Sequence, residues 1–133
     1  MKTLLAALAI LWASPWSLLG LLVGLTGLAT GGGVQRRGRV LEFWGGLVTW
    51  LLRHAPLPSE GAMAMTLGHT VLGQTRAALD LTRDHEAVHV RQYEIWGLFF
   101  IPAYFACSLV LRLAGKDAYR DNPFEKQAYD KAP

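Results

Sequence analysis

One cysteine, Cys107, is all that the 133-residue sequence contains. A single thiol inside an apolar segment excludes an internal disulfide and a zinc site built from cysteines. The sequence also lacks internal repeats and low-complexity tails, so it is neither a repeat array nor a disordered linker protein. Its length suits one small domain.

Charged residues are absent from Thr3 to Gln35, where Leu, Ala, Gly, Val and Trp dominate. An apolar run well above about 18 residues is typical of a transmembrane helix or an uncleaved signal anchor. Lys2 would also suit the start of a cleaved signal peptide, but "LATG" at 28–31 makes a poor cleavage site. We therefore expect residues 1–33 to be a membrane anchor with a glycine-rich linker, and membrane lipid to be a partner.

The net charge of +3 is modest, and the basic residues do not form an aromatic-interleaved surface. No nucleic-acid partner is therefore expected. Arg36, Arg37 and Arg39 instead follow the apolar run directly, as the charged flank of a membrane helix does. They outnumber Lys2 before it, which favours a cytoplasmic domain, whereas the signal-like N-terminus favours the exterior. We favour the cytoplasmic face.

Residues 34–133 are predicted to form a second unit, and the whole chain is expected to be of the α+β class. "TGGGVQRRGR" (30–39) predicts a flexible junction, and "RVLEFWGG" predicts a short strand. "LVTWLLRH" predicts a short helix that Pro56 and Pro58 end. "AMAMTLGHTVLG" (62–73) predicts one or two further strands around a turn, completing a small antiparallel sheet.

A long helix is predicted from about Thr75 to Trp96, with Gly97 ending it. Apolar side chains recur on one stripe of this helix and are expected to face the core. They are Ala77, Leu81, Val88 and Ile95.

A second apolar run covers residues 98–113 and predicts a helix over 98–114. Its length is at the lower limit for crossing a bilayer, so a buried core helix and an interfacial hairpin are equally open. A loop follows, and Pro123 suits the first turn of a last short helix, "PFEKQAYDKA".

The long helix contains "HEAVH", which supplies His85, Glu86 and His89. Histidines four apart lie on one helix face, so both imidazoles can reach one ion. Glu86 lies roughly 100° round the helix from His85, beside the metal without being a ligand. From there it can take a proton from a water molecule that zinc activates. Two histidine ligands, one general base and one open coordination position are the parts of a zinc hydrolase.

A third ligand must come from elsewhere in the chain. Glu94 is close in sequence, but it points roughly 180° from His85, to the polar back of the helix. Glu125 is the better candidate, because an antiparallel return through residues 98–113 would bring it alongside the motif. Two further acidic residues are the alternatives: Asp121 and Asp130. The choice of Glu125 requires that residues 98–113 do not span, since crossing would carry it to the opposite side of the membrane.

Three other residues are candidates for the site. Tyr93 lies roughly 80° from His85 and would orient substrate or donate to an oxyanion, unless it packs against the second apolar run. Tyr129, one turn beyond Glu125, is another candidate donor. His69 lies in a predicted strand near the site, where a surface or packing role competes with a functional one.

"HEAVH" followed by an acidic residue on another helix resembles the gluzincin type of zinc metallopeptidase. "TLGHTVLG", "HEAVHVRQYEIWG", "FFIPAY" and "YRDNPFEKQA" together are similar to a group of small bacterial membrane-associated proteins, over roughly residues 40–130. The resemblance implies a minimal zincin-like fold at the bacterial inner membrane. It also implies His85 and His89 as zinc ligands, Glu86 as the base and Glu125 as the third ligand.

The leading hypothesis is therefore a zinc-dependent peptidase acting on a peptide or protein laid along the sheet edge. Full metallopeptidases build substrate clefts from larger flanking subdomains, for which a chain of this length has little room. One alternative is a non-catalytic membrane protein whose helices are held together by zinc or by hydrogen bonds alone. Another is an accessory subunit that docks a larger membrane complex. An open coordination position near Glu86 would favour the enzyme, and a fourth protein ligand the structural site.

Overall fold

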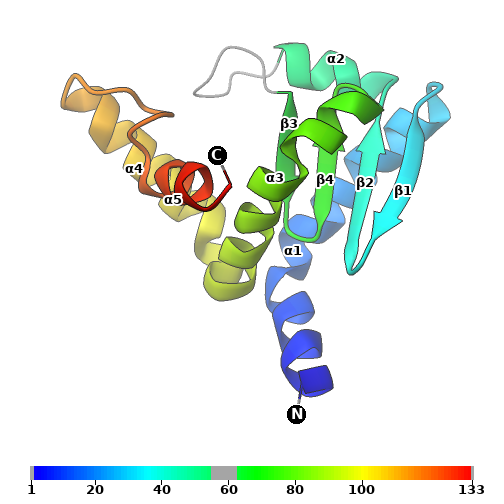
Figure 1. Cartoon of the computed structure of the whole chain (residues 1–133), viewed down its shortest axis with the longest axis horizontal. Coiled ribbons are helices and arrows are strands. Elements are labelled where there is room, and N and C mark those ends of the chain that lie inside the picture. The colour runs from blue at the N-terminus through cyan, green and yellow to red at the C-terminus, as the bar shows by residue number, and fades with distance from the viewer. Residues whose placement is uncertain (1, 55–62, 133) are drawn as a thin grey trace.

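The computed structural model describes residues 2–54 and 63–132, so Pro56 and Pro58 lie outside the described residues. The helices are α1 (Lys2–Ala29), α2 (Leu47–His54), α3 (Arg76–Trp96), α4 (Phe100–Leu113) and α5 (Pro123–Lys131), with a 3₁₀ turn η1 (Gly97–Phe99) between α3 and α4. A small sheet lies between α1 and α2 on one side and α3 on the other (Figure 1). The α+β class is thus as predicted.

Four strands form the sheet in the order β1-β2-β4-β3. They are β1 (Gly33–Arg37), β2 (Val40–Trp44), β3 (Ala64–Leu67) and β4 (Thr70–Gly73). β1–β2 and β3–β4 are antiparallel hairpins, each with a positive-φ glycine, Gly38 or Gly68, in its two-residue turn.

β2 and β4 pair in parallel, so the sheet is mixed and the prediction of an antiparallel sheet is wrong. Parallel neighbours need a crossover connection, and the chain between β2 and β4 supplies one by passing through α2 and β3. The crossover leaves β3 at one edge of the sheet.

β1 occupies much of the segment for which the sequence predicts a flexible junction, and that prediction is also wrong. The glycines there permit close packing: a Cβ on Gly32 would meet the Trp44 carbonyl oxygen, and one on Gly33 would meet the Trp44 ring. Because Gly32 and Gly33 have no side chain, the backbone of this segment can pack closely against Trp44 of β2.

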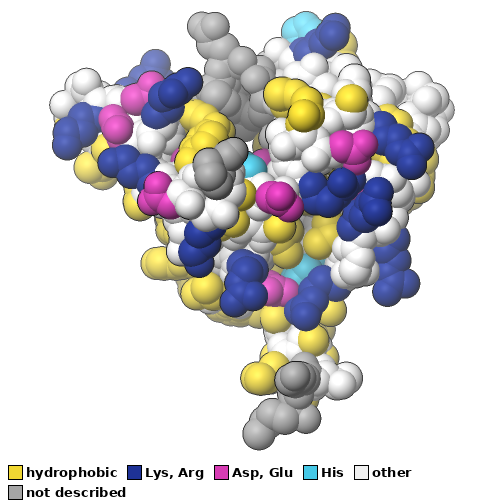
Figure 2. Space-filling model, in the orientation of Figure 1, with side chains coloured by type: hydrophobic (Ala, Val, Ile, Leu, Met, Phe, Trp, Pro, Cys, Tyr) yellow, Lys and Arg dark blue, Asp and Glu magenta, His cyan; other side chains and the backbone are white. Residues whose placement is uncertain are grey.

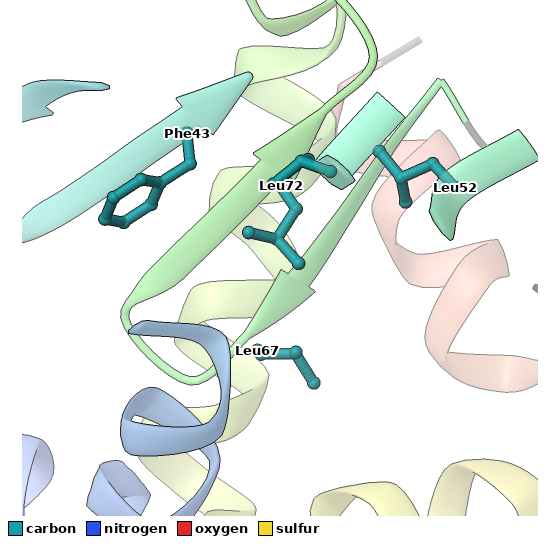
Figure 3. Packing of buried hydrophobic residues seen from close by; sticks show 5 residues of the cluster. Phe43, Leu52, Leu67 and Leu72 are labelled. Carbon is teal, nitrogen blue, oxygen red and sulfur yellow. The ribbon is translucent and has the colours of Figure 1, made fainter. Parts of the chain in front are cut away.

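One face of the sheet carries the main apolar core. Phe43, Leu67 and Leu72 are buried there against Val48 and Leu52 of α2 (Figure 3). α1 covers the same face with three partly buried side chains: Leu21, Val23 and Leu28. The apolar N-terminal helix is therefore packed into the fold, and the two predicted units share one core.

Two helical stretches, Thr3–Ala29 and Arg76–Leu113, are long and apolar enough to cross a membrane, by length and composition only. In the second stretch α3 and α4 meet at η1 and diverge in a V, with α5 lying between them (Figure 1). That return brings the C-terminal helix back to α3.

α3 begins and ends where the sequence predicts. At the N-terminus the Thr75 hydroxyl accepts a hydrogen bond from Ala78 N at 3.0 Å. At the C-terminus Gly97, at φ 55°, donates its N–H to Tyr93 O. The predicted core stripe is wrong, because Leu81 is 78% exposed and Ile95 71% exposed. The buried residues of α3 are instead Ala78, Leu79, Glu86, His89, Val90, Gln92 and Tyr93. The inward face therefore combines four apolar residues with three polar ones, Glu86, His89 and Gln92, and apolar periodicity alone cannot reveal such a face.

α5 also follows its sequence signals. Asn122 caps it by accepting from Phe124 N at 2.9 Å, and Pro123 occupies the first turn as predicted.

Candidate metal centre

Three side chains from two helices converge at one point: His85 and His89 of α3, and Glu125 of α5. The Nε2 atoms of His85 and His89 lie 3.1 and 2.8 Å from Glu125 Oε1. All three ligand atoms lie within 4.8 Å of one another. Two ligand atoms about 2.0–2.1 Å from one tetrahedral zinc are about 3.3 Å apart, so small movements would suffice. The group could hold a metal ion.

The other acidic candidates are placed elsewhere. Glu94 Oε2 accepts from Arg39 at 2.8 Å and pairs with His69 Nε2 at 2.9 Å, on the far side of α3 as its helical angle predicts. Among residues 2–54 and 63–132, neither Asp121 nor Asp130 belongs to the metal-ligand group.

The electrostatics of the group favour a positive charge between the ligands. Burial alone would raise the pKa of the Glu125 carboxyl, but hydrogen bonds from His85 and His89 hold it at about 2. Burial alone would lower the pKa of His89, but the hydrogen bond to Glu125 and the charge of Glu86 raise it to about 9. A bound cation would take the place of the histidine proton.

Two side chains that the sequence reasoning missed orient the ligands. Gln92 Oε1 lies 2.8 Å from His89 Nδ1, so a proton on Nδ1 leaves Nε2 facing the site. The Tyr104 hydroxyl donates to Glu125 Oε2 at 2.7 Å. Gln92 follows His89 by three residues and thus shares its helix face, a signal that could have found it. Tyr104 lies within an apolar run and carried no such signal.

Glu86 lies beside the ligand group. It is 6% exposed, and its Oε2 is 3.8 Å from His85 Nε2. The Thr66 hydroxyl of β3 donates to its Oε1 at 2.8 Å, which fixes the carboxylate from the sheet side. Burial raises the pKa of this carboxyl.

The tyrosine and histidine candidates have distinct surroundings. Tyr93 is 1% exposed, donates its hydroxyl to Thr66 O at 2.9 Å and packs on Phe100 of η1–α4 with ring centroids 4.2 Å apart. The Tyr129 ring packs against the His85 ring at a tilt of 60°, with centroids 4.5 Å apart. His69 lies in the β3–β4 turn, paired with Glu94 and away from the ligands.

A cavity of about 710 Å³ opens over the ligand group. The motif of α3, the strand β3, the first turns of α4, and α5 line it. Most of its wall is apolar, contributed by Met63, Met65, Leu67, Leu81, Phe100, Ile101 and Phe105. This volume is within the range of small-ligand and peptide sites.

The fold and the site together define an α+β protein with a two-helix His–His–Glu metal-ligand group facing a cavity. No protein-family model, curated protein or solved structure matches the chain.

Proposed function

We propose that the protein is a zinc-dependent hydrolase, a membrane-associated metallopeptidase of the gluzincin type. The observation that carries the proposal is the number of ligands. Catalytic zinc sites use three protein ligands and keep one position open, whereas structural sites close with four. In the part of the chain that the structure describes, the group has three members, with Glu86 beside it.

When bound, zinc supplies a Lewis acid that lowers the pKa of a coordinated water to about 7. Glu86 then acts as general base, taking the proton of the attacking water on its carboxylate and passing it to the leaving amine. Thr66 holds the carboxylate through Oε1 and leaves Oε2 toward the ligand group. His85, His89 and Glu125 would hold the metal.

The substrate in this proposal is an extended peptide that adds to the edge strand β3. Gln74 N donates to Met63 O at 2.9 Å, so the alternation of the antiparallel ladder turns the backbone groups of Ala64 and Thr66 away from β4. Tyr93 accordingly reaches the Thr66 carbonyl from that side. A peptide paired with this edge would pass the ligand group, as in other strand-addition complexes. Tyr93 then acts by holding β3, and donation to an oxyanion is its alternative role.

The test is hydrolysis of a peptide library by purified full chain loaded with zinc, compared with Glu86→Gln. Loss of the general base should lower turnover by about 10²–10⁴-fold while zinc content stays the same. His85→Ala should lose the metal. Turnover that persists in Glu86→Gln would refute the mechanism, and equal zinc content in His85→Ala would refute the site.

A structural zinc site is the second candidate function, and one observation favours it. The ligands come from α3 and α5, so a metal would join two helices of a small core, as metals do in small domains. In that case zinc removal would unfold the chain and no peptide would be cleaved.

We further propose that the domain faces the cytoplasm. Arg36, Arg37 and Arg39 are exposed and follow α1, which suits the anionic inner leaflet. Protease protection of a C-terminal tag in intact cells tests this placement: digestion from outside would contradict it.

A further inference from the structure

The outward face of α1 carries a stripe of leucines along its whole length. Its members are 49–67% exposed and follow one another at intervals of three, four or seven residues: Leu4, Leu8, Leu11, Leu18, Leu22 and Leu25. Pro15 stands at the position that the spacing would give to a leucine between Leu11 and Leu18. Such spacing keeps side chains on one side of a helix, which here is about 42 Å long. A surface of this kind needs an apolar partner.

The opposite face of α1 packs against the sheet, where glycines allow a close approach between the larger side chains of Leu21, Val23 and Leu28. A Cβ on Gly20 would lie 2.8 Å from Thr70 Cβ, and one on Gly27 would lie 2.6 Å from Val48 Cγ2. Ala13 is fully buried, and its carbonyl oxygen lies against Gly68 of the β3–β4 turn. Only residues 3–12, about 15 Å of helix, precede Ala13, and that is half the roughly 30 Å of bilayer hydrocarbon.

A chain of polar contacts ties the charged side chain of Arg39 to the middle of α1. The Ser17 hydroxyl accepts from His69 N at 2.8 Å, His69 Nε2 lies 2.9 Å from Glu94, and Glu94 pairs with Arg39 at 2.8 Å. Ser17 is close to the midpoint of α1. A helix crossing the membrane upright would therefore hold the half-exposed guanidinium of Arg39 near the bilayer centre, where a charge is costly.

Hydroxyl groups within α1 donate to carbonyls of their own helix. Pro15 has no N–H for the Leu11 carbonyl, and the Ser14 hydroxyl donates to that carbonyl at 2.7 Å. Thr26 donates to Val23 O at 2.6 Å. Hydroxyls turned back to their own helix suit a lipid environment, where no water replaces the missing bonds.

We infer that α1 lies in the plane of one leaflet, with its leucine stripe in the hydrocarbon, and that the chain does not cross the membrane through α1. The occupant of the stripe is the lipid bilayer. α3 lies on the other side of the sheet from α1 (Figure 1), and basic and acidic side chains suited to water cover the face seen in Figure 2. Those of α3 itself include the exposed Arg76, Asp80, Asp84 and Arg91. Both ends of α1 are then on the same side of the membrane. The inference does not rest on the metal site.

The test measures depth in the bilayer at single cysteines. Three variants of the full chain are made in a Cys107→Ser background, and each has one new cysteine: Leu4→Cys, Leu11→Cys or Leu25→Cys. A fluorophore is attached to that cysteine. The protein is reconstituted in vesicles of phosphatidylethanolamine and phosphatidylglycerol, and lipid-bound spin labels at several depths quench the fluorophore. Ala77→Cys, on the exposed side of α3, is the matched control, and circular dichroism verifies the fold of every variant.

In-plane placement predicts that the three stripe positions have the same depth within about 5 Å, roughly one helical turn. The labelled control should stay unquenched, and the control before labelling should react with a water-soluble maleimide. A spanning helix would place positions 4 and 25 in opposite leaflets and position 11 near the bilayer centre. A depth difference of about 10 Å between positions 4 and 11, which are seven residues apart, would therefore show a spanning helix and overturn the inference. Absence of lipid quenching with disulfide-linked pairs of chains would show that a second copy covers the stripe, and would also overturn it.

Discussion

Gln92 provides the sharpest test of the metal site, because it touches a ligand without being one. Its side chain is 2% exposed, accepts from His89 Nδ1 at 2.8 Å and donates to the Phe124 carbonyl at 2.9 Å. Gln92→Met keeps the length of the side chain and removes these two bonds together with the one that Gln92 donates to Gln127. The buried His89 N–H then lacks its acceptor, and the ring loses its fixed orientation.

Loss of such an outer-shell partner weakens metal affinity about 10–100-fold, equivalent to about 1.4–2.7 kcal/mol. The assay is competition for zinc between purified full chain and a chromophoric chelator at constant pH. Gln127→Met is the matched control: Gln127 Oε1 accepts from Gln92 Nε2 at 2.7 Å, so this change leaves the bond to His89 intact. Equal zinc dissociation constants for folded Gln92→Met and the parent chain would refute the role of Gln92.

Two further predictions concern the packing that supports the site. Arg83→Met should destabilise the fold by about 3 kcal/mol, because Glu42, whose side chain is 3% exposed, loses the guanidinium that binds both its oxygens. Denaturant unfolding beside the exposed-residue control Arg91→Met checks this, and equal stability of the two variants would contradict it. Gly24→Leu should lower the melting temperature strongly, because a side chain there meets the Phe43 ring. The exposed neighbour Leu25→Ala is the control, and an unchanged melting temperature in Gly24→Leu would contradict the packing of α1.

Features governed by local chemistry were predictable from the sequence. Thr75 and Gly97 bound α3 because a hydroxyl and a positive-φ glycine act on the helix ends next to them. His85 and His89 share a face because of helical geometry alone. The choice of Glu125 over Glu94 also followed from helical angle and from the length of the return. The structure brings Glu125 to the two histidines and directs Glu94 to Arg39.

Features governed by distant partners were not predictable in this way. The parallel pairing of β2 with β4 depends on which strand of the second hairpin lies inward, and neither strand's sequence specifies that. The apolar stripe through Leu81 and Ile95 misled because the inward face of α3 carries polar residues that are satisfied across the fold by β3 and α5. Only the partners reveal that such a face is buried.

The apolar N-terminal helix and the metal site belong to one set of contacts. Ser17 holds the β3–β4 turn through His69 N, and β3 carries Thr66, whose hydroxyl positions Glu86. α1 also supplies part of the cover for the core face on which Phe43 is buried. A segment starting at residue 34 would lose that cover and the support of the turn together. Activity or its absence in such a segment would therefore report on a disrupted sheet, so the chemistry of the site has to be tested in the full chain.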